Sequence, residues 1–172
     1  MAVGKKICML GDFGVGKTSL VRRYVHNEFS PDYQTTLGVN IYKYTDEVPT
    51  DAGPVEFRHL LWDIEGGLQR QSLLDSYIGG SAGAIVVGDV SRPDRIETMR
   101  ENAMRFQQAR PGRPVVFALN KSDLIEQDDL AAEAESLAKD FRGSVQYTSA
   151  LTGEAVAALF RTLAEQILTI KA

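Results

Sequence analysis

The chain has 172 residues, of which 44% are hydrophobic and 24% are charged, a balance that is typical of one folded domain of ordinary size. Its formal net charge of −4 argues against general binding to nucleic acid or to anionic membranes. One cysteine and two histidines exclude an internal disulfide and a Cys/His zinc site, and no apolar run reaches a membrane span or a signal peptide, so we expect a cytoplasmic protein.

The predicted elements alternate between strands and helices. Continuous apolar runs predict parallel strands, the last of them weaker than the others, at residues 7–10, 84–87, 115–119 and 145–147. An amphipathic pattern predicts a helix directly after residue 18, and apolar side chains at steps of three and four predict others over residues 96–106, 130–141 and 156–167. This alternation indicates a parallel sheet with helices on both faces.

Residues 37–62 interrupt the alternation. Two strand-like segments, residues 39–44 and 55–62, are separated by the turn-forming segment 49–54, which predicts an antiparallel hairpin at the edge of the sheet. We therefore expect a single α/β domain, residues 1–172, with three layers and a six-stranded, mostly parallel sheet. Ligands of such sheets bind at the carboxyl ends of the strands.

A glycine-rich loop follows the first predicted strand. Residues 11–18 read Gly-x-x-x-x-Gly-Lys-Thr, which is the pattern of a phosphate-binding loop in its required strand–loop–helix setting. Its glycines let backbone N–H groups surround phosphate oxygens, Lys17 adds a positive charge, and Thr18 offers a hydroxyl ligand to Mg²⁺. The candidate phosphate-binding residues of this segment are Gly11, Phe13, Gly14, Val15, Gly16, Lys17, Thr18 and Ser19.

Two later loops predict which base is bound. A carboxylate at Asp123 can accept from the N1–H and 2-amino groups of guanine, a donor pair that adenine lacks, so the wrong base leaves a buried acceptor unpaired. Asn120 is expected to tie this loop to the phosphate loop, the Lys121 stem to cover one face of the base, and the Ala150 N–H to donate to guanine O6. The candidate guanine-binding residues in these loops are Asn120, Lys121, Asp123, Ser149, Ala150 and Leu151.

The order of these segments along the chain resembles the Ras superfamily of small GTPases. A phosphate loop, Asn-Lys-x-Asp and Thr-Ser-Ala each end a successive strand, and residues 11–20, 36–39 and 85–90 are most similar to the Rab branch. The resemblance implies the P-loop NTPase fold of small G proteins and a switch that binds GTP or GDP with Mg²⁺ and hydrolyses GTP. It also implies a monomer whose partners are effectors, exchange factors and GTPase-activating proteins.

The resemblance also assigns roles to residues between the loops. Thr36 would reach Mg²⁺ and the γ-phosphate, Asp63 would hold Mg²⁺ through water, and the Gly66 N–H would hold the γ-phosphate. Phe29 would pack edge-on against the guanine. The candidate metal ligands are therefore Thr18, Thr36 and Asp63.

Three apolar residues, Ile41, Trp62 and Tyr77, match the hydrophobic triad that Rab proteins present to effectors. Packing between the hairpin and a helix is the other interpretation of this cluster. The sequence lacks the C-terminal cysteine that carries the prenyl anchor of Rab proteins, so we expect no membrane anchor within this chain. Either a tail with this cysteine was removed or the protein uses none, and a prokaryotic Rab-like GTPase would fit the second case.

Three residues depart from the family pattern. Gly67 stands where the family has the glutamine that orients the attacking water, and Phe13 stands where it has a small residue. Glu65 replaces a small residue, and its carboxylate either lies near the phosphates or turns to solvent. Because no side chain at position 67 can orient water, we expect slow intrinsic hydrolysis.

A different residue could take over that role. Gln69 is the first candidate to orient water, with Lys17 and Thr36 as the other candidate catalytic residues, and Arg70 is the second candidate as a positive charge. The alternative is that Gln69 and Arg70 are ordinary polar surface residues.

Two functions stay open at this point. The first is a GTP/GDP switch with slow hydrolysis, and the second is a GTP-binding interaction module with little or no hydrolysis. A P-loop kinase is disfavoured, because it needs a second substrate lobe or lid and has no use for the Asn-Lys-x-Asp segment. A turnover assay separates the first two.

Overall fold

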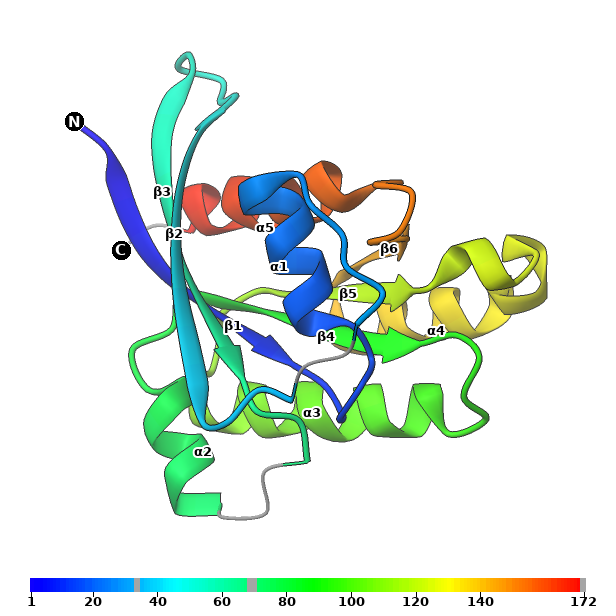
Figure 1. The fold of residues 1–172 in the computed structure, drawn as a ribbon. Helices are drawn as coiled ribbons and strands as arrows, with labels where there is room; N and C mark the ends of the chain where they lie inside the picture. Colours follow the sequence, from blue (N-terminus) through cyan, green and yellow to red (C-terminus); the bar gives the residue numbers. More distant parts are fainter. Residues whose placement is uncertain (33–34, 68–70, 171–172) are drawn as a thin grey trace.

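The computed structural model describes residues 1–32, 35–67 and 71–170. Within them, six strands form one sheet in the spatial order β2-β3-β1-β4-β5-β6 (Figure 1). The strands are β1 (Val3–Leu10), β2 (Val39–Val48), β3 (Val55–Ile64), β4 (Gly83–Asp89), β5 (Val115–Asn120) and β6 (Ser144–Thr148). Every neighbouring pair is parallel except β2 and β3, so the predicted sheet and its antiparallel edge hairpin are confirmed.

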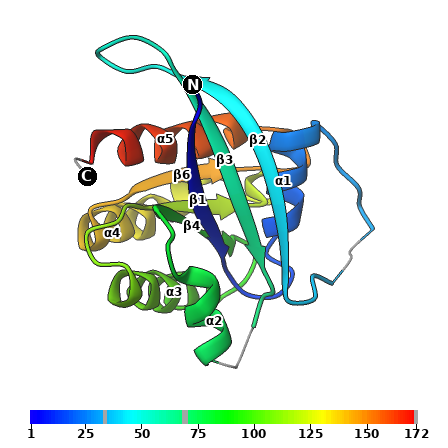
Figure 2. The same cartoon turned by 90° about the vertical axis from the view of Figure 1, so that its left-hand side faces the viewer.

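Helices cover both faces of the sheet and complete the three layers (Figure 2). They are α1 (Lys17–His26), α2 (Gln71–Ile78), α3 (Arg95–Ala109), α4 (Ala131–Phe141) and α5 (Val156–Thr169). Helices α1 and α5 pack on one face, whereas α2, α3 and α4 pack on the other. Two short 3-10 helices, Ser122–Leu124 and Gln127–Leu130, lie between β5 and α4.

The apolar patterns of the sequence form the two halves of the core. In α5, the repeating apolar residues Val156, Leu159, Phe160, Leu163 and Ile167 are all buried against the sheet. On the opposite face, Met99, Ala103 and Phe106 of α3 are buried in the same way. Strands β4 and β5 are buried along their whole length, as expected for central parallel strands.

The strand boundaries differ from the sequence prediction mainly where polar residues are paired. Strand β1 begins at Val3 rather than at residue 7, because Val3–Lys6 pair with β3 through their backbone although none of these residues is buried. Strand β2 runs to Val48, where it pairs with Val55 at the start of β3. The turn between them covers the predicted residues 49–54.

The register of the sheet brings distant loops together. In the parallel pair β1–β3, Met9 lies opposite Asp63, so the loop after β1 and the segment after β3 begin side by side. In the pair β4–β5, Asp89 lies opposite Asn120, and Asn120 in turn lies opposite Thr148 of β6. The loops that carry the sequence motifs therefore meet at one edge of the sheet.

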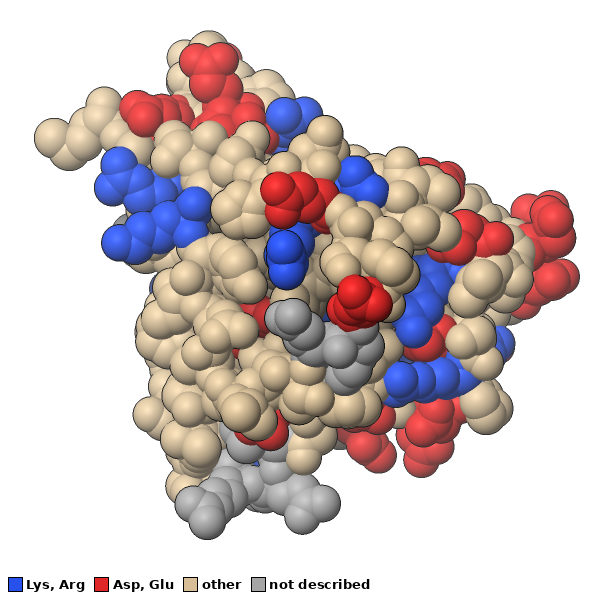
Figure 3. Space-filling view, in the orientation of Figure 1, with Lys and Arg blue, Asp and Glu red and all other residues tan. Residues whose placement is uncertain are grey.

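The surface carries both signs of charge. On the face drawn in Figure 3, Lys and Arg side chains gather beside the N-terminal end of β1, and Asp and Glu side chains gather over the β2–β3 turn and over the segment between β5 and α4. Among the helices that the structure describes, none is both long enough and apolar enough to cross a membrane.

Candidate nucleotide-binding site

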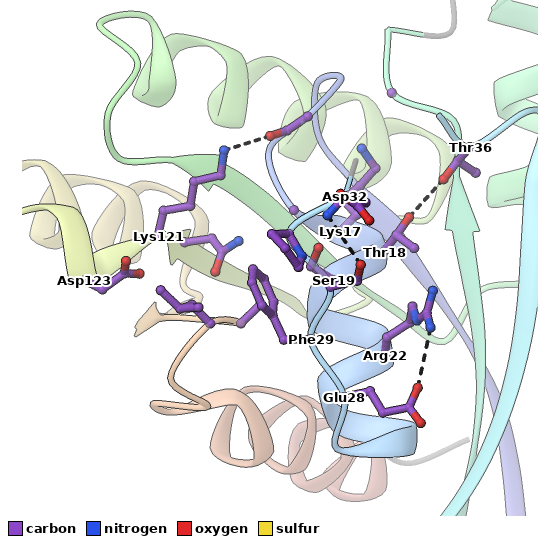
Figure 4. Close-up of a pocket in the computed structure, with 18 of the residues that line it drawn as sticks. Lys17, Thr18, Ser19, Arg22, Glu28, Phe29, Asp32, Thr36, Lys121 and Asp123 are labelled. Carbon is purple, nitrogen blue, oxygen red and sulfur yellow. Dashed lines mark hydrogen bonds and ion pairs between the residues drawn. The ribbon is translucent and has the colours of Figure 1, made fainter. Parts of the chain in front are cut away.

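A cavity of about 330 Å³ lies at the carboxyl ends of the strands. Figure 4 shows Lys17, Thr18 and Thr36 toward one end of this cavity, Lys121 and Asp123 toward the other, and Phe29 between them. Most of the predicted phosphate and base residues line it: Phe13, Gly14, Gly16, Lys17, Thr18, Ser19, Phe29, Thr36, Gly66, Asn120, Lys121, Asp123, Ala150 and Leu151. The sequence therefore predicted a set of residues that the fold gathers around one space.

Four of the predicted residues support the cavity from behind. Gly11 and Val15 are buried, and their carbonyl oxygens accept bonds from side chains of the site. Asp63 lies behind Thr18, and Ser149 lies behind Asp123, each joined to it by a side-chain hydrogen bond. Gln69 and Arg70, the candidates for orienting water or supplying charge, lie outside the described residues, so their roles stay predictions.

The phosphate loop closes around Lys17. This side chain is only 6% exposed, and its Nζ donates to the carbonyl oxygens of Gly11 at 2.9 Å and Asp12 at 3.0 Å. Burial lowers the pKa of Lys17 to about 8, an effect that the nearby Asp63 and Asp12 oppose. The loop thus presents a buried amine beside its backbone, which is the arrangement that a phosphate chain needs.

Gly16 is required where the loop enters α1. Its φ is 102°, a left-handed conformation that favours glycine, and a Cβ at this position would collide with the Asn120 side chain. Residue 16 is also the N-cap of α1, so the positive end of the helix dipole faces the cavity.

Asn120 ties the base loop to the phosphate loop, as the sequence predicts. It is 1% exposed at the end of β5, where its Nδ2 donates to the Val15 carbonyl at 2.9 Å. Its Oδ1 accepts from the Thr148 hydroxyl at 3.1 Å, so the amide also holds the last strand. Lys121 adds a second link, because its Nζ donates to the Gly14 carbonyl at 3.1 Å.

The Asp123 carboxylate is exposed toward the cavity and is oriented by a hydrogen bond from Ser149, which lies behind it. The Ser149 hydroxyl donates to Asp123 Oδ1 at 2.8 Å. Since Ser149 is buried and precedes Ala150 in the chain, the two loops that were assigned to the base are joined by this bond. One carboxylate oxygen is thereby fixed, and the carboxylate lines the cavity.

Thr18, Thr36 and Asp63 form a cluster of oxygen atoms. The Thr18 hydroxyl donates to Asp63 Oδ2, and the Thr36 hydroxyl lies 2.9 Å from that of Thr18 (Figure 4). Because a carboxylate can only accept, the Thr18 hydroxyl donates its proton to Asp63 and accepts a hydrogen bond from the Thr36 hydroxyl. Asp63 is fully buried, and burial raises the pKa of its carboxyl group against the opposing effects of Thr18, Lys17 and Thr36.

This cluster fits a magnesium ion. Asp63 Oδ1 is buried and has no hydrogen-bond partner among the described residues, which is an unfavourable state for a carboxylate unless a cation or its water satisfies it. Hydroxyl and carboxylate oxygens are the ligands that Mg²⁺ prefers, with phosphate oxygens and water completing its coordination. Among the described residues no group of three or more His, Cys, Asp or Glu side chains could hold a metal by itself.

Gly66 brings the segment after β3 against the phosphate loop. A Cβ on Gly66 would collide with the backbone of Asp12 and Phe13, so only glycine permits this approach. Glu65, which precedes it, is half-buried and does not turn to solvent: its Oε2 accepts from the Gly38 N–H at 3.1 Å. The sequence left two arrangements open for the Glu65 carboxylate, near the phosphates or turned to solvent. The contact with Gly38 is neither of them.

Several residues that line the cavity were missed by sequence reasoning. Arg22, Glu28, Asp32 and Leu124 all lie on its wall, and Arg22 pairs with Glu28 at 3.5 Å. Arg22 lies four residues after Thr18 on α1, so helical spacing placed it on the same face and could have indicated it. No pattern indicated Glu28 or Asp32, because their positions depend on how the segment after α1 folds over the helix.

The chain is similar to known proteins of one family. The sequence model described as "Ras family" matches residues 6–169. The human Ras-related protein Rab-22A is 34% identical over 141 residues, which cover 81% of this chain and 69% of that protein. Rat Ras-related protein Rab-31 is 32% identical over 94% of this chain and 82% of its own length. The Ypt/Rab-type GTPase ypt7 of Schizosaccharomyces pombe is 34% identical over 93% of this chain and 80% of its own length.

Proposed function

Because the chain belongs to the Ras family and has Rab-related homologues, we propose that it is a molecular switch that binds GTP and GDP with Mg²⁺ and hydrolyses GTP slowly. The family supports a GTP-binding small GTPase. The further details rest on the site, and the observation that carries them is a single cavity with Lys17 at one end and the Ser149-oriented Asp123 carboxylate at the other.

Guanine is the base that this cavity fits. With one oxygen held by Ser149, the Asp123 carboxylate keeps further acceptor positions for the two donors on one edge of guanine. Adenine would leave those acceptors without partners, at a cost that can exclude it. The Ala150 N–H is proposed to donate to guanine O6, and Phe29 and the Lys121 stem to cover the base.

The phosphates are bound by the loop and by Lys17. Backbone N–H groups of residues 11–18 and the positive end of α1 attract the phosphate oxygens, and Lys17 neutralises part of their charge. Thr18 and Thr36 would hold Mg²⁺ directly and Asp63 through water; the ion supplies positive charge that withdraws electrons from the phosphates. Thr36 and the Gly66 N–H would contact the γ-phosphate.

Two segments would sense that phosphate. We name residues 36–38 the first switch segment and residues 65–67 the second switch segment. Both lie next to the phosphate loop, through the Thr36–Thr18 contact and the packing of Gly66 on Asp12 and Phe13. Loss of the γ-phosphate removes a shared contact, which lets both segments leave.

Partners would recognise these segments together with the neighbouring hairpin. Ile41 is 51% exposed and lies opposite Trp62 in the β2–β3 register, and the rings of Trp62 and Tyr77 are 6.4 Å apart. Trp62 and Tyr77 are partly buried against the core, so they contribute to packing as well as to this surface. We propose it as the site for effectors, exchange factors and any GTPase-activating protein, on a single-domain, cytoplasmic monomer.

The second candidate is a GTP-binding interaction module with little or no hydrolysis. Gly67 favours it, since this residue is exposed and has no side chain with which to orient a water molecule. Both candidates share the ligand and the partners, and they differ only in turnover.

Two measurements test the proposal. Calorimetry with Mg²⁺ should give binding of GDP at least about a hundredfold tighter than binding of ADP, which corresponds to about 2.7 kcal/mol. Equal affinities would contradict guanine recognition, and binding of neither nucleotide would contradict the proposal as a whole. Single-turnover incubation with GTP then separates the candidates: release of phosphate supports the slow GTPase, and its absence supports the interaction module.

A further inference from the structure

Glu65 binds both backbone polar groups of Gly38. The Glu65 N–H donates to the Gly38 carbonyl at 2.8 Å, and the Gly38 N–H donates to the Glu65 carboxylate, at Oε2, at 3.1 Å. The two residues are 27 positions apart and belong to the second and the first switch segment. A carboxylate of the second segment therefore holds the backbone of the first.

This contact extends the β2–β3 ladder by one pair. The last strand pair toward the site is Val39 with Ile64, and the next would be Gly38 with Glu65. In an antiparallel ladder a hydrogen-bonded pair exchanges two N–H···O=C bonds. Here the first bond is made by the backbone, and the Glu65 carboxylate accepts the second in place of the residue's own carbonyl group. The side-chain acceptor of residue 65 thus completes the second bond of this pair, which the backbone alone leaves with one.

Gly38 is the attachment point nearest to Thr36. The intervening Leu37 is 79% exposed, so its side chain packs on little and cannot hold the segment. Thr36 itself lies 2.9 Å from the Thr18 hydroxyl, within the oxygen cluster that fits Mg²⁺. Besides the bond between Thr36 and Thr18, the backbone bonds of Gly38 therefore hold this segment beside that cluster.

The second switch segment is itself anchored. Gly66 packs directly on the backbone of Asp12 and Phe13 in the phosphate loop, as close as its lack of a side chain permits. Residues 65 and 66 thus contact the phosphate loop on one side and the first switch segment on the other. A displacement of residue 66 would pull the Glu65 carboxylate from Gly38, and the two segments would move together.

We infer that Glu65 is a positioning residue whose carboxylate, by accepting from the Gly38 N–H, holds Thr36 at the metal cluster and couples the two switch segments. This inference rests on the proposed function for the role of Thr36, although the contact itself does not depend on it. A small residue at position 65 would leave the Gly38 N–H to water and the first segment attached by one bond fewer.

Two substitutions separate the acceptor from the rest of the side chain. Glu65→Ala removes the acceptor, whereas Glu65→Gln retains an amide oxygen that can accept from the Gly38 N–H. Glu56→Ala is the matched control, because Glu56 is exposed on the same strand far from the site. Amide hydrogen exchange of Gly38, followed by NMR on the whole chain as purified, reads the contact directly.

We expect the Gly38 amide to exchange about tenfold faster in Glu65→Ala, and within about threefold of the unmodified chain in Glu65→Gln and Glu56→Ala. Unchanged exchange in Glu65→Ala, or equal acceleration in Glu65→Gln, would overturn the inference. Because this readout needs no nucleotide, it tests the contact even if calorimetry with GDP contradicts the proposed function.

A second readout tests positioning of Thr36. In Mg²⁺, Glu65→Ala should release a non-hydrolysable GTP analogue about tenfold faster and GDP less than threefold faster, because Thr36 engages the γ-phosphate. In a Thr36→Ala background, Glu65→Ala should add nothing further. Equal acceleration for both nucleotides, or full additivity with Thr36→Ala, would mean that Glu65 has only a structural role and would overturn the inference.

Discussion

At the base end of the cavity, the Asp123 carboxylate is the residue that we propose to select the base. We predict that Asp123→Asn weakens GDP binding by about a hundredfold or more, because two hydrogen bonds to a charged group are lost or reversed, each of about 1.5–3 kcal/mol. The same change should improve binding of xanthosine diphosphate, whose 2-oxo group presents an acceptor to the new amide. Calorimetry with GDP and with xanthosine diphosphate measures both changes in affinity.

Asp128→Asn is the matched control, since Asp128 is an exposed carboxylate five residues further along the chain. It should leave both affinities unchanged. If Asp123→Asn bound GDP as tightly as the unmodified chain does, Asp123 would not be the residue that reads the base.

At the phosphate end, Gly67 and Phe13 depart from the family pattern, and we propose that both slow hydrolysis. We predict that Gly67→Gln combined with Phe13→Gly accelerates single-turnover hydrolysis tenfold or more, or about 1.4 kcal/mol of barrier. The glutamine would orient water, and the smaller residue would open the space beside the γ-phosphate; Phe13 is 51% exposed on the cavity wall.

The substitution Gln69→Ala tests the alternative explanation, in which Gln69 orients the attacking water. Rapid hydrolysis in the unmodified chain that is lost in Gln69→Ala would mean that Gln69 orients the water and that Gly67 is no defect. Rapid hydrolysis that persists in Gln69→Ala, together with no gain from the double substitution, would contradict both explanations.

Residue spacing in the sequence predicts some side-chain contacts and not others. The bond from Asn120 to the phosphate loop was predictable, because parallel strands end at the same edge of a sheet and deliver their loops to one place. The bond from Gly38 to Glu65 was not, since a backbone N–H carries no sequence signal and the two residues meet only through the hairpin register.

At the scale of elements, long apolar patterns identified the strands and helices of the core, whereas no such pattern predicted α2. This helix has eight residues, and only Leu74 and Ile78 are fully buried among its described side chains. Two buried positions do not establish a helical period. The hairpin was predictable, because its turn residues stand between two segments of β-branched and aromatic residues.

Asn120 joins three elements, and its loss should destabilise the fold without any ligand. We predict that Asn120→Ala lowers the free energy of unfolding by about 1–3 kcal/mol, because the buried carbonyl of Val15 and the hydroxyl of Thr148 both lose a partner. Thr148→Val is the control that removes one of these bonds, and it should cost about 1 kcal/mol. Urea unfolding checks both; equal and negligible costs would contradict the linking role.

A buried histidine between β3 and the α1–α5 layer makes stability depend on pH. His59 is fully buried, its Nε2 lies 3.1 Å from the Tyr24 hydroxyl, and that hydroxyl donates to Asp46 at 3.0 Å. Because Asp46 takes the tyrosine proton, His59 donates through Nε2, and its buried Nδ1 has no partner among the described residues. Burial lowers the pKa of His59 to about 4; Asp46 opposes this effect and Arg161 adds to it.

The folded state therefore disfavours protonation of His59. The contribution of this group to the free energy of unfolding is complete above pH 6.5 and is lost as the pH falls toward 4. We predict that the free energy of unfolding drops by roughly 2 kcal/mol between pH 7 and pH 5 from this group. In His59→Phe, which keeps an aromatic ring among Tyr24, Phe57 and Phe160, that drop should disappear. A drop of equal size in the variant would assign it to other groups.

At the scale of the whole molecule, one edge of the sheet carries the phosphate loop, the base loops and both switch segments. Asn120 and Lys121 bind the base loop to the phosphate loop, and Glu65 and Gly66 bind the switch segments to each other and to the same loop. A ligand that contacts the phosphate loop therefore lies beside the base loop and beside both switch segments.

The measurement that tests this account most directly is amide hydrogen exchange along the whole chain in Mg²⁺, with GDP compared with a non-hydrolysable GTP analogue. We predict that both nucleotides protect the phosphate and base loops equally. We also predict that the analogue alone protects residues 36–38 and 65–67, and that it protects them together. Identical exchange with the two nucleotides would contradict the switch, and unchanged exchange in the loops with either would contradict the nucleotide site.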